Sequence, residues 1–478
     1  MNKEQPWTIG RIIFASLMSL LLLGYLAVIA TYSDPTTTGK TFLFPGFVWL
    51  LRIITGIMAL YLGKLWKDRG FRILAVFLLL KLIRILADGS GSVFEEAVSD
   101  SLLTGFWAFS ACYGMARIFS RNQLKRILDL CVMTWTLGMI VYSCLGIYAA
   151  WTGEYIPTIG EGAAWYVPLH RVYLAYYPTV AGSILSMGAV LAMCGVVAAK
   201  NKPVKLLFLV SLIPTMIALC LTDSRCAQVT VSAGFATMAG LFVLRTLREQ
   251  ARKRGRKGGY AWAAAAAVTG VIFVAFVLLC MQTITVFNKV RSEGLLFTRA
   301  LAEGTKAKPI VSNRGFTGDN VLTNRPVIWK ATIQVLMENP LLLLWGTSIR
   351  NSMTLVNASP VMTLFANHCH CMPLMILLEN GIPGILLVGA FLFRTAAAAF
   401  RLVLKADRKR DLLPVPFLIS ILVGELVECF TWLRAGQCPT LAFFFAAAGI
   451  IMVTGQKPGM ETGMTSQAIP EASAPGQP

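Results

Sequence analysis

Two histidines alternate with two cysteines in the stretch from His368 to Cys371, directly before a long apolar run. Cysteine in apolar surroundings behaves as a small hydrophobic residue, so the histidines are the stronger candidates for chemistry. A helix is expected to begin near Met372, because Pro373 suits a first helical turn. The positive end of the helix dipole then favours the neutral form of His370. The stretch therefore predicts a general base at a helix N-terminus.

Three arginines are predicted to face the same side of a membrane as these histidines. Arg171 precedes one apolar run, and Arg225 lies in the short turn between two others. Arg325 belongs to the long polar segment that ends at His370. Guanidinium groups bind phosphate through paired hydrogen bonds, and helix N-termini favour anions. The set predicts a phosphate-containing ligand, although each arginine alone is also compatible with a charge at the lipid interface or in a surface loop.

A metal centre is the alternative interpretation of the histidine and cysteine stretch. Imidazole and thiolate are good zinc ligands. Four adjacent residues cannot easily surround one ion, however, and no second group of ligands lies nearby in the sequence. The arginines would also repel a cation. We therefore expect neither a metal nor a cofactor.

The elements that carry these residues are predicted to be membrane helices. The chain has 478 residues, of which 56% are hydrophobic and 14% charged, whereas soluble domains have about 25% charged residues. Apolar runs of about 20 residues recur, which is the length that crosses a bilayer. We expect an all-α polytopic membrane protein of about twelve transmembrane helices, at residues 10–31, 43–63, 71–87, 101–117, 127–150, 173–199, 204–222, 226–244, 260–286, 373–394, 413–433 and 438–454.

The connections between the runs give the orientation. The connection 88–100 has no Lys or Arg, whereas alternate connections are basic, at 64–72, 117–126, 200–205, 248–259 and 401–411. Lys and Arg are enriched in cytoplasmic connections. Both termini are therefore expected in the cytoplasm of a multi-pass protein of the bacterial cytoplasmic membrane. Much of the net charge of +20 then reflects topology, and no nucleic-acid partner is needed.

Four parts are expected along the chain. Residues 1–286 hold membrane helices 1–9, and residues 287–372 form a large extracytoplasmic loop. Residues 373–454 hold helices 10–12, and residues 455–478 form a disordered cytoplasmic tail. Loops as long as the second part are usually functional or disordered. This one has apolar anchors and is expected to fold partly over the outer mouth of the bundle.

Residues of roughly 165–395 resemble the O-antigen ligase and O-antigen polymerase superfamily. Its R-x-x-x-W motif in a large loop is matched by Arg325 to Trp329. Its H-N-x-x-L-x-x-L-x-E-x-G-x-x-G helix is matched by residues 370–384, with His370 as the family histidine.

Other parts of the family pattern are matched less closely. The S-R pair after a membrane helix is found at Ser224-Arg225, and an R-x-x-G-x-x-x-x-P pattern is matched only loosely from Arg171. Cys371 stands where the family has asparagine, and Asn367 is the nearest substitute for that amide.

The resemblance implies a metal-independent inverting glycosyltransferase of the GT-C fold. It would move a glycan from undecaprenyl pyrophosphate to a glycan, lipid or wall-polymer acceptor on the extracytoplasmic face. His370 would deprotonate or orient the acceptor hydroxyl, while Arg325 and Arg225 would hold the pyrophosphate leaving group. The expected substrate-binding residues are Arg171, Trp329, Asn367 and His368.

Three alternatives remain open at this point. A polymerase of the same superfamily differs from a ligase in its acceptor, and a non-catalytic scaffold is compatible with the substitution at Cys371. A transporter or flippase of lipid-linked sugars would show internal repeats and midplane ionisable residues. No convincing repeat is present. Mutual pairing is the favoured explanation for the ionisable residues in or near the spans, which are Arg52, Lys81, Arg84, Glu425 and Glu428.

Overall fold

The computed structural model describes residues 7–31, 45–88, 102–152, 156–157, 164–166, 173–174, 178–255, 258–292, 325–347, 349–362, 365–366, 368–406, 409–426, 428, 444 and 446–450. Two predicted substrate-binding residues, Arg171 and Asn367, lie outside the described residues. So do residues 293–324 of the predicted loop and the predicted tail 455–478.

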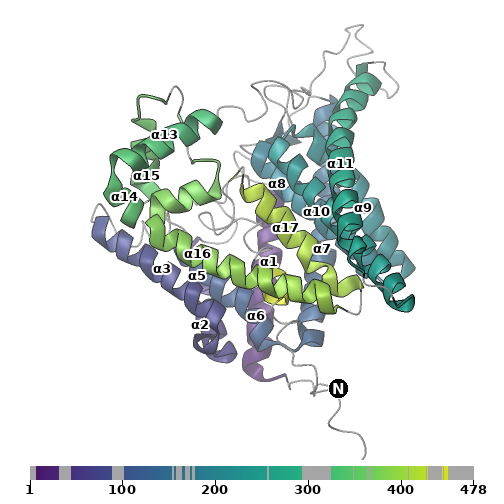
Figure 1. Ribbon diagram of the computed structural model, residues 1–478, viewed down its shortest axis with the longest axis horizontal. Helices are drawn as coiled ribbons and strands as arrows, with labels where there is room; N and C mark the ends of the chain where they lie inside the picture. Colours follow the sequence, from purple (N-terminus) through teal and green to yellow (C-terminus); the bar gives the residue numbers. More distant parts are fainter. Residues whose placement is uncertain are drawn as a thin grey trace, which may run out of the picture.

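The described chain is mainly helical (Figure 1). Its first part consists of α1 (Ile9–Thr31), α2 (Pro45–Gly63), η1 (Leu65–Lys67), α3 (Arg69–Asp88), α5 (Leu102–Trp107), η2 (Ala108–Cys112), α6 (Tyr113–Ile118) and α7 (Arg121–Thr152). Its second part consists of α8 (Pro178–Ala198), α9 (Lys202–Leu221), α10 (Arg225–Lys253), α11 (Tyr260–Ser292), α13 (Arg325–Glu338), α14 (Pro340–Trp345), α15 (Ile349–Asn357), α16 (Met372–Lys405), η5 (Lys409–Leu412) and α17 (Pro414–Glu425).

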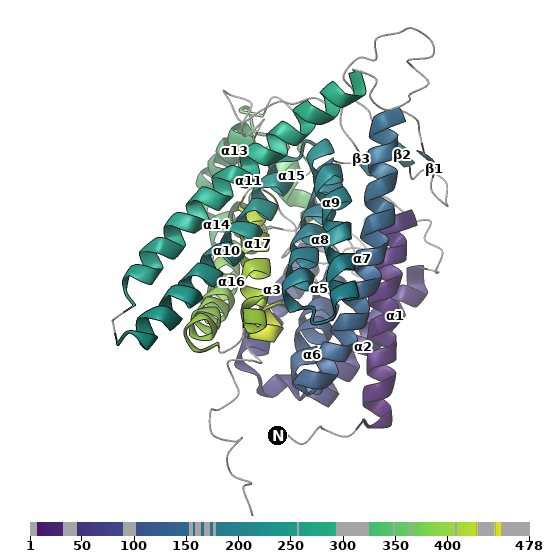
Figure 2. The same ribbon diagram turned by 90° about the vertical axis from the view of Figure 1, so that its right-hand side faces the viewer.

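The long apolar runs of the sequence do form helices. Six helices in the described residues are long and apolar enough to cross a membrane, namely α7, α8, α9, α10, α11 and α16. Shorter apolar helical stretches lie within α1, α2 and α17. With 33 residues, α11 extends over about 50 Å at 1.5 Å per residue, and it runs obliquely along one side of the bundle (Figure 2). The protein is a polytopic membrane protein, while the total of twelve spans stays a prediction.

Two features depart from the predicted regular helices. The run expected at 101–117 is divided by η2, a five-residue π-helix, between α5 and α6. Three short antiparallel strands, β1 (Ile156–Pro157), β2 (Ala164–Tyr166) and β3 (Tyr173–Leu174), pair in the order β1-β2-β3. The all-α prediction missed this sheet, because two or three residues give no alternating pattern that could be recognised.

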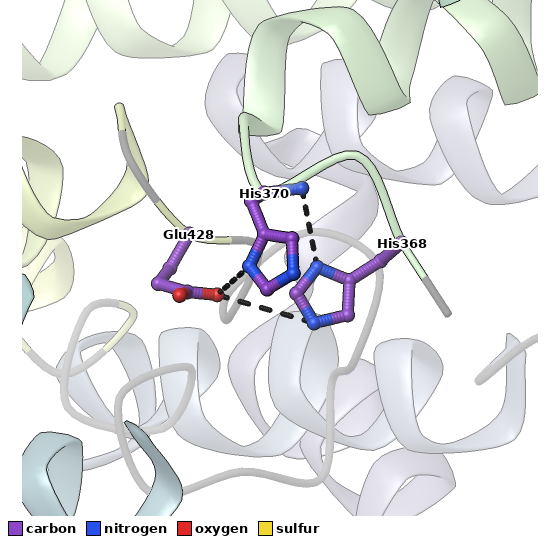
Figure 3. Close-up of side chains that lie close together, drawn as sticks. All are labelled: His368, His370 and Glu428. Atoms are coloured by element: carbon purple, nitrogen blue, oxygen red, sulfur yellow. Dashed lines mark hydrogen bonds and ion pairs between the residues drawn. The ribbon is translucent and has the colours of Figure 1, made fainter. Parts of the chain in front are cut away.

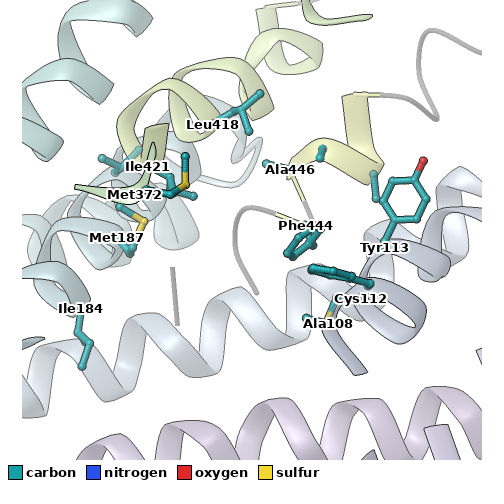
Figure 4. Close-up of a cluster of buried hydrophobic side chains, with 14 of the residues drawn as sticks. Ala108, Cys112, Tyr113, Ile184, Met187, Met372, Leu418, Ile421, Phe444 and Ala446 are labelled. Carbon is teal, nitrogen blue, oxygen red and sulfur yellow. The ribbon is translucent and has the colours of Figure 1, made fainter. Parts of the chain in front are cut away.

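A buried cluster joins helices that are far apart in the sequence (Figure 4). Its labelled side chains come from η2, α6, α8, α16 and α17 and from Phe444 and Ala446. Phe444 is fully buried, and its ring lies 4.6 Å from that of Phe109 and 6.1 Å from that of Phe391. Phe444 is thus packed against both η2 and α16.

The helices of the predicted loop are attached to α16 at a kink. α13, α14 and α15 gather near one end of α16 (Figure 1). Gly381 interrupts α16 with φ 59° and ψ −164°, and Gly346 ends α14 with φ 73° and ψ −165°. Both conformations are almost restricted to glycine. The backbone N–H of Thr347 donates to the carbonyl of Leu378 at 2.9 Å, so α14 is held directly on the backbone of α16.

Replacing Gly381 with alanine is expected to destabilise this attachment. A Cβ at Gly381 would lie 2.6 Å from the carbonyl oxygen of Leu344, and the backbone conformation alone costs about 1–3 kcal/mol for a residue with a side chain. Gly389→Ala is the matched control in the same helix, because a Cβ there meets nothing within 4 Å. Thermal unfolding in detergent should show a lowered midpoint for Gly381→Ala and an unchanged or raised midpoint for Gly389→Ala. Equal midpoints for the two variants would contradict the attachment.

A buried carboxylate ties the connection after α2 to α6. Asp68 is 4% exposed and accepts hydrogen bonds from the Phe71 backbone N–H at 2.9 Å, the Tyr113 hydroxyl at 3.0 Å and Arg117 Nε at 3.1 Å. Burial acts to raise the pKa of Asp68, but these hydrogen bonds and the charge of Arg117 outweigh it and lower the pKa below its ordinary value of 3.8. Asp68 therefore stabilises the fold as an anion.

Asp68→Asn is expected to lower the free energy of unfolding near neutral pH by about 1.5–3 kcal/mol, the range for hydrogen bonds to charged groups. Because the folded-state pKa is lowered, the stabilisation is fully present above the unfolded pKa and is lost as the pH falls through the folded pKa. The control is Glu249→Gln, which removes an exposed i,i+4 pair with Arg245 worth about 0.3–0.5 kcal/mol. Thermal unfolding of the three proteins at pH 7 and at about pH 3, below the ordinary pKa of 3.8, tests this prediction. The difference in midpoint between the native protein and Asp68→Asn should shrink at the lower pH, and an unchanged midpoint for Asp68→Asn at pH 7 would refute the prediction.

Candidate functional site

The two histidines lie on the non-helical segment that leads into α16. α16 begins at Met372, with Pro373 in its first turn and Cys371 as the N-cap residue, as the sequence predicts. His368 and His370 face each other, with ring centroids 3.9 Å apart, while the thiol of Cys369 points elsewhere and contacts Thr332 at 3.4 Å.

A buried carboxylate that follows α17 in the sequence contacts both histidines. Glu428 follows α17 and has a side chain that is 1% exposed. Its Oε2 lies 2.9 Å from Nδ1 of His370 and 3.9 Å from Nε2 of His368 (Figure 3). Because an ionised carboxylate can only accept, the short contact assigns a proton to Nδ1 of His370. The other ring nitrogen, Nε2, is then the basic atom of a neutral His370.

The backbone orients both rings. The N–H of His370 donates to Nδ1 of His368 at 3.2 Å, so that a neutral His368 carries its proton on Nε2, toward Glu428. His370 adopts a positive φ of 51°, which is uncommon for residues other than glycine, though less so for histidine. The turn at His370 therefore fixes the direction of both imidazoles, and the His370 side chain remains 27% exposed.

The R-x-x-x-W motif lies on one face of α13 and reaches the same segment. Arg325 is the first residue of α13, and its Nη2 donates to Oε1 of Glu428 at 2.5 Å. Trp329, one turn later, donates its indole N–H to the carbonyl of Cys369 at 2.9 Å. Residues four apart share a helix face, which explains the spacing of the motif. Arg325 contacts the carboxylate, and Trp329 holds the backbone between the two histidines.

Arg225 begins α10 beside the end of α17. Its side chain is buried, at 7% exposure. The next residue, Cys226, donates its S–H to the Gly424 carbonyl at 3.6 Å and lies within electrostatic reach of Glu428 and Arg325. The N-terminus of α10, with Arg225 as its first residue, therefore lies beside the end of α17, the helix that precedes Glu428. The positive end of the α10 dipole adds to the positive charge there.

Cys369 and Cys371 do not form one metal-binding group with the two histidines. Burial raises the pKa of the Cys369 thiol to about 12, and its Sγ packs 4.0 Å from Sδ of Met353. The thiol is therefore protonated and neutral, whereas the thiolate is the form that binds a metal. Among the described residues, the group with metal-ligand spacing is instead formed by His368, His370 and Glu428.

The sequence interpretation of Glu428 was incomplete. It expected this carboxylate to pair with bases inside the membrane spans, whereas its observed contacts are with Arg325 and the histidines. Arg52, one of those bases, lies over the rings of Trp49 and Trp107. An acidic side chain near the end of an apolar run costs free energy in a membrane and therefore suggests a functional site. This position of Glu428 was the sequence signal that could have identified it as a site residue.

Comparison with known proteins agrees with the motifs. A family model described as O-antigen ligase matches residues 207–389, a segment that includes Arg225, Arg325, Trp329 and His370 and ends before Glu428. A search of curated proteins finds no match. Residues 207–389 therefore match the same O-antigen ligase family that the motifs of the sequence resemble.

Proposed function

We propose that the protein transfers a glycan from undecaprenyl pyrophosphate to an acceptor at the outer face of the cytoplasmic membrane, without a metal. The observation that carries the proposal is the 2.9 Å contact between Glu428 and Nδ1 of His370, in a chain of which residues 207–389 match the O-antigen ligase family. A carboxylate that holds one nitrogen of an imidazole fixes the tautomer, raises the basicity of the other nitrogen and stabilises the imidazolium that forms.

His370 acts as the general base. Its Nε2 removes the proton from the acceptor hydroxyl while that oxygen attacks the anomeric carbon of the donor. The bond from the anomeric carbon to the phosphate oxygen breaks, and undecaprenyl pyrophosphate leaves with the electron pair. Attack from the side opposite the leaving group inverts the anomeric configuration. Glu428 stays ionised beside the imidazolium and lowers the free energy of that charged state.

The arginines stabilise the leaving group. Charge accumulates on the pyrophosphate as the glycosidic bond breaks, and fixed guanidinium groups in a poorly hydrated site interact strongly with it. Arg225 is almost buried and lies at a helix N-terminus, where anions are favoured. Arg325 carries a rigid fork of N–H donors that suits a phosphate, and its contact with Glu428 holds that side chain in place. Since these groups supply the positive charge, no metal ion is required.

The test is product analysis with purified protein. A fluorescent undecaprenyl-pyrophosphate glycan is incubated with candidate acceptors in the presence of EDTA, and the anomeric configuration of the product is determined by NMR. The proposal expects transfer with inversion. One glycan unit per acceptor indicates a ligase, whereas a ladder of carrier-linked lengths indicates a polymerase. Retention of configuration, or transfer that needs added metal, would contradict the proposed chemistry, and translocation of an intact donor would indicate a transporter.

A further inference from the structure

We propose that His368, His370 and Glu428 form a binding site for a zinc-like divalent cation, and that the bound cation inhibits the protein. The binding part stands on the geometry alone, while the inhibition part rests on the proposed glycosyl transfer. A metal that inhibits is compatible with a reaction that needs none, because it would occupy the atoms that hold and transfer the proton.

The spacing of the three side chains suits one ion. One ligand atom from each lies within 4.8 Å of the others, and Oε2 of Glu428 is 2.9 Å from Nδ1 of His370 and 3.9 Å from Nε2 of His368. Zinc binds imidazole nitrogen and carboxylate oxygen at about 2.0–2.2 Å, so ligand atoms of one ion lie no more than about 4.4 Å apart. A small rotation of the His368 ring brings all three atoms into that range.

The surrounding contacts orient the three ligand atoms toward one another and hold the histidine rings. Nδ1 of His368 already accepts the backbone N–H of His370, which leaves Nε2 to face the carboxylate. Oε1 of Glu428 is occupied by Arg325, which leaves Oε2 toward the histidines. Supporting hydrogen bonds of this kind orient the ligands of metal sites. Three protein ligands with an open fourth position match zinc sites that exchange a ligand.

The charge of the site selects the kind of cation. Arg325 offsets the charge of Glu428, so a cation gains little from simple attraction and must form strong bonds to nitrogen. Zinc and copper bind imidazole well, whereas magnesium and calcium prefer oxygen ligands. Binding also replaces the proton on Nδ1 of His370. The metal then withdraws electron density from the ring and breaks the contact with Glu428, so that Nε2 becomes a poorer base.

Zinc binding is measured by competition with a fluorescent zinc chelator. The full-length protein carries Cys371→Ser and Cys429→Ser, which remove two thiols adjacent in sequence to the ligands. Cys369 is kept because its thiol is buried against Thr332 and Met353. This protein is expected to bind one zinc, and His368→Gln in the same background is expected to bind it at least about tenfold more weakly. His170→Gln, which replaces the third histidine of the chain, is the matched control and should leave the affinity unchanged. Loss of binding in the serine background, or equal affinity for His368→Gln, would overturn the site.

Inhibition is measured separately, as the fraction of each protein's own zinc-free transfer rate. The expected result is inhibition that EDTA reverses, with at least about tenfold more zinc needed for His368→Gln. Zinc that binds with the expected dependence on His368 but leaves transfer unchanged would overturn the inhibitory role and leave the binding site. A protein without any transfer activity would contradict the proposed function, whereas the chelator measurement would still decide whether the site exists.

Discussion

His370→Ala is expected to reduce glycan transfer by about 100-fold to 10,000-fold, the range that a positioned general base contributes. The acceptor hydroxyl would then lose its proton to water, without the imidazole whose orientation the 2.9 Å contact with Glu428 fixes. Donor affinity should change little, because the pyrophosphate is held by the arginines. The effect is therefore expected in kcat rather than in the KM for the donor.

The measurement is the rate of transfer at saturating donor, together with donor binding by a fluorescent analogue. Cys371→Ser is the neighbouring control, since Cys371 is the N-cap residue of α16 and does not belong to the group formed by His368, His370 and Glu428. It should retain most of the activity. If His370→Ala transfers glycan at the native rate, His370 is not the base. If it loses donor binding as well as transfer, the residue acts in binding the donor instead.

Glu428→Gln is expected to reduce transfer by about 100-fold or more, by reversing the tautomer of His370. The amide of glutamine can donate to Nδ1, which places the proton on Nε2, where the base is needed. In a serine hydrolase triad the corresponding change from acid to amide costs about 10,000-fold in rate. Glutamine keeps the shape of the side chain and can still accept from Arg325, so the rate effect is expected to exceed the effect on folding.

Two further measurements separate catalysis from stability for Glu428. The midpoint of thermal unfolding should fall moderately for Glu428→Gln and further for Glu428→Leu. Leucine removes the carboxylate partner of the Arg325 guanidinium, whose side chain is only 12% exposed. Breaking a buried ion pair costs about 3–5 kcal/mol. Glu338→Gln removes an exposed acid and serves as the control for charge. Native activity in Glu428→Gln would contradict the assigned tautomer.

Much of the site could be predicted because its parts are local in sequence. Pro373 indicates the start of α16, and the structure begins that helix at Met372. The four-residue spacing of Arg325 and Trp329 places both on one face of α13, where they contact Glu428 and the Cys369 carbonyl. Apolar runs give the membrane helices, since length and composition alone decide whether a segment can cross a bilayer.

The rest depends on contacts between distant segments. Glu428 lies 58 residues from His370, and no periodicity relates an acid after α17 to a histidine before α16. The attachment of α14 to α16 depends on two glycine conformations, at Gly346 and Gly381, and the sequence interpretation assigned neither of them a contact. The predicted roles of Arg171 and Asn367 lie outside the described residues and stay predictions.

The most direct measurement is the release of undecaprenyl pyrophosphate by purified protein in EDTA, with and without acceptor, for the native chain, His370→Ala and Glu428→Gln. The account predicts release by the native chain that depends on the acceptor, and a loss of about 100-fold or more in both variants. Release at the native rate in either variant would contradict the central claim that Glu428 holds His370 as the base of the transfer.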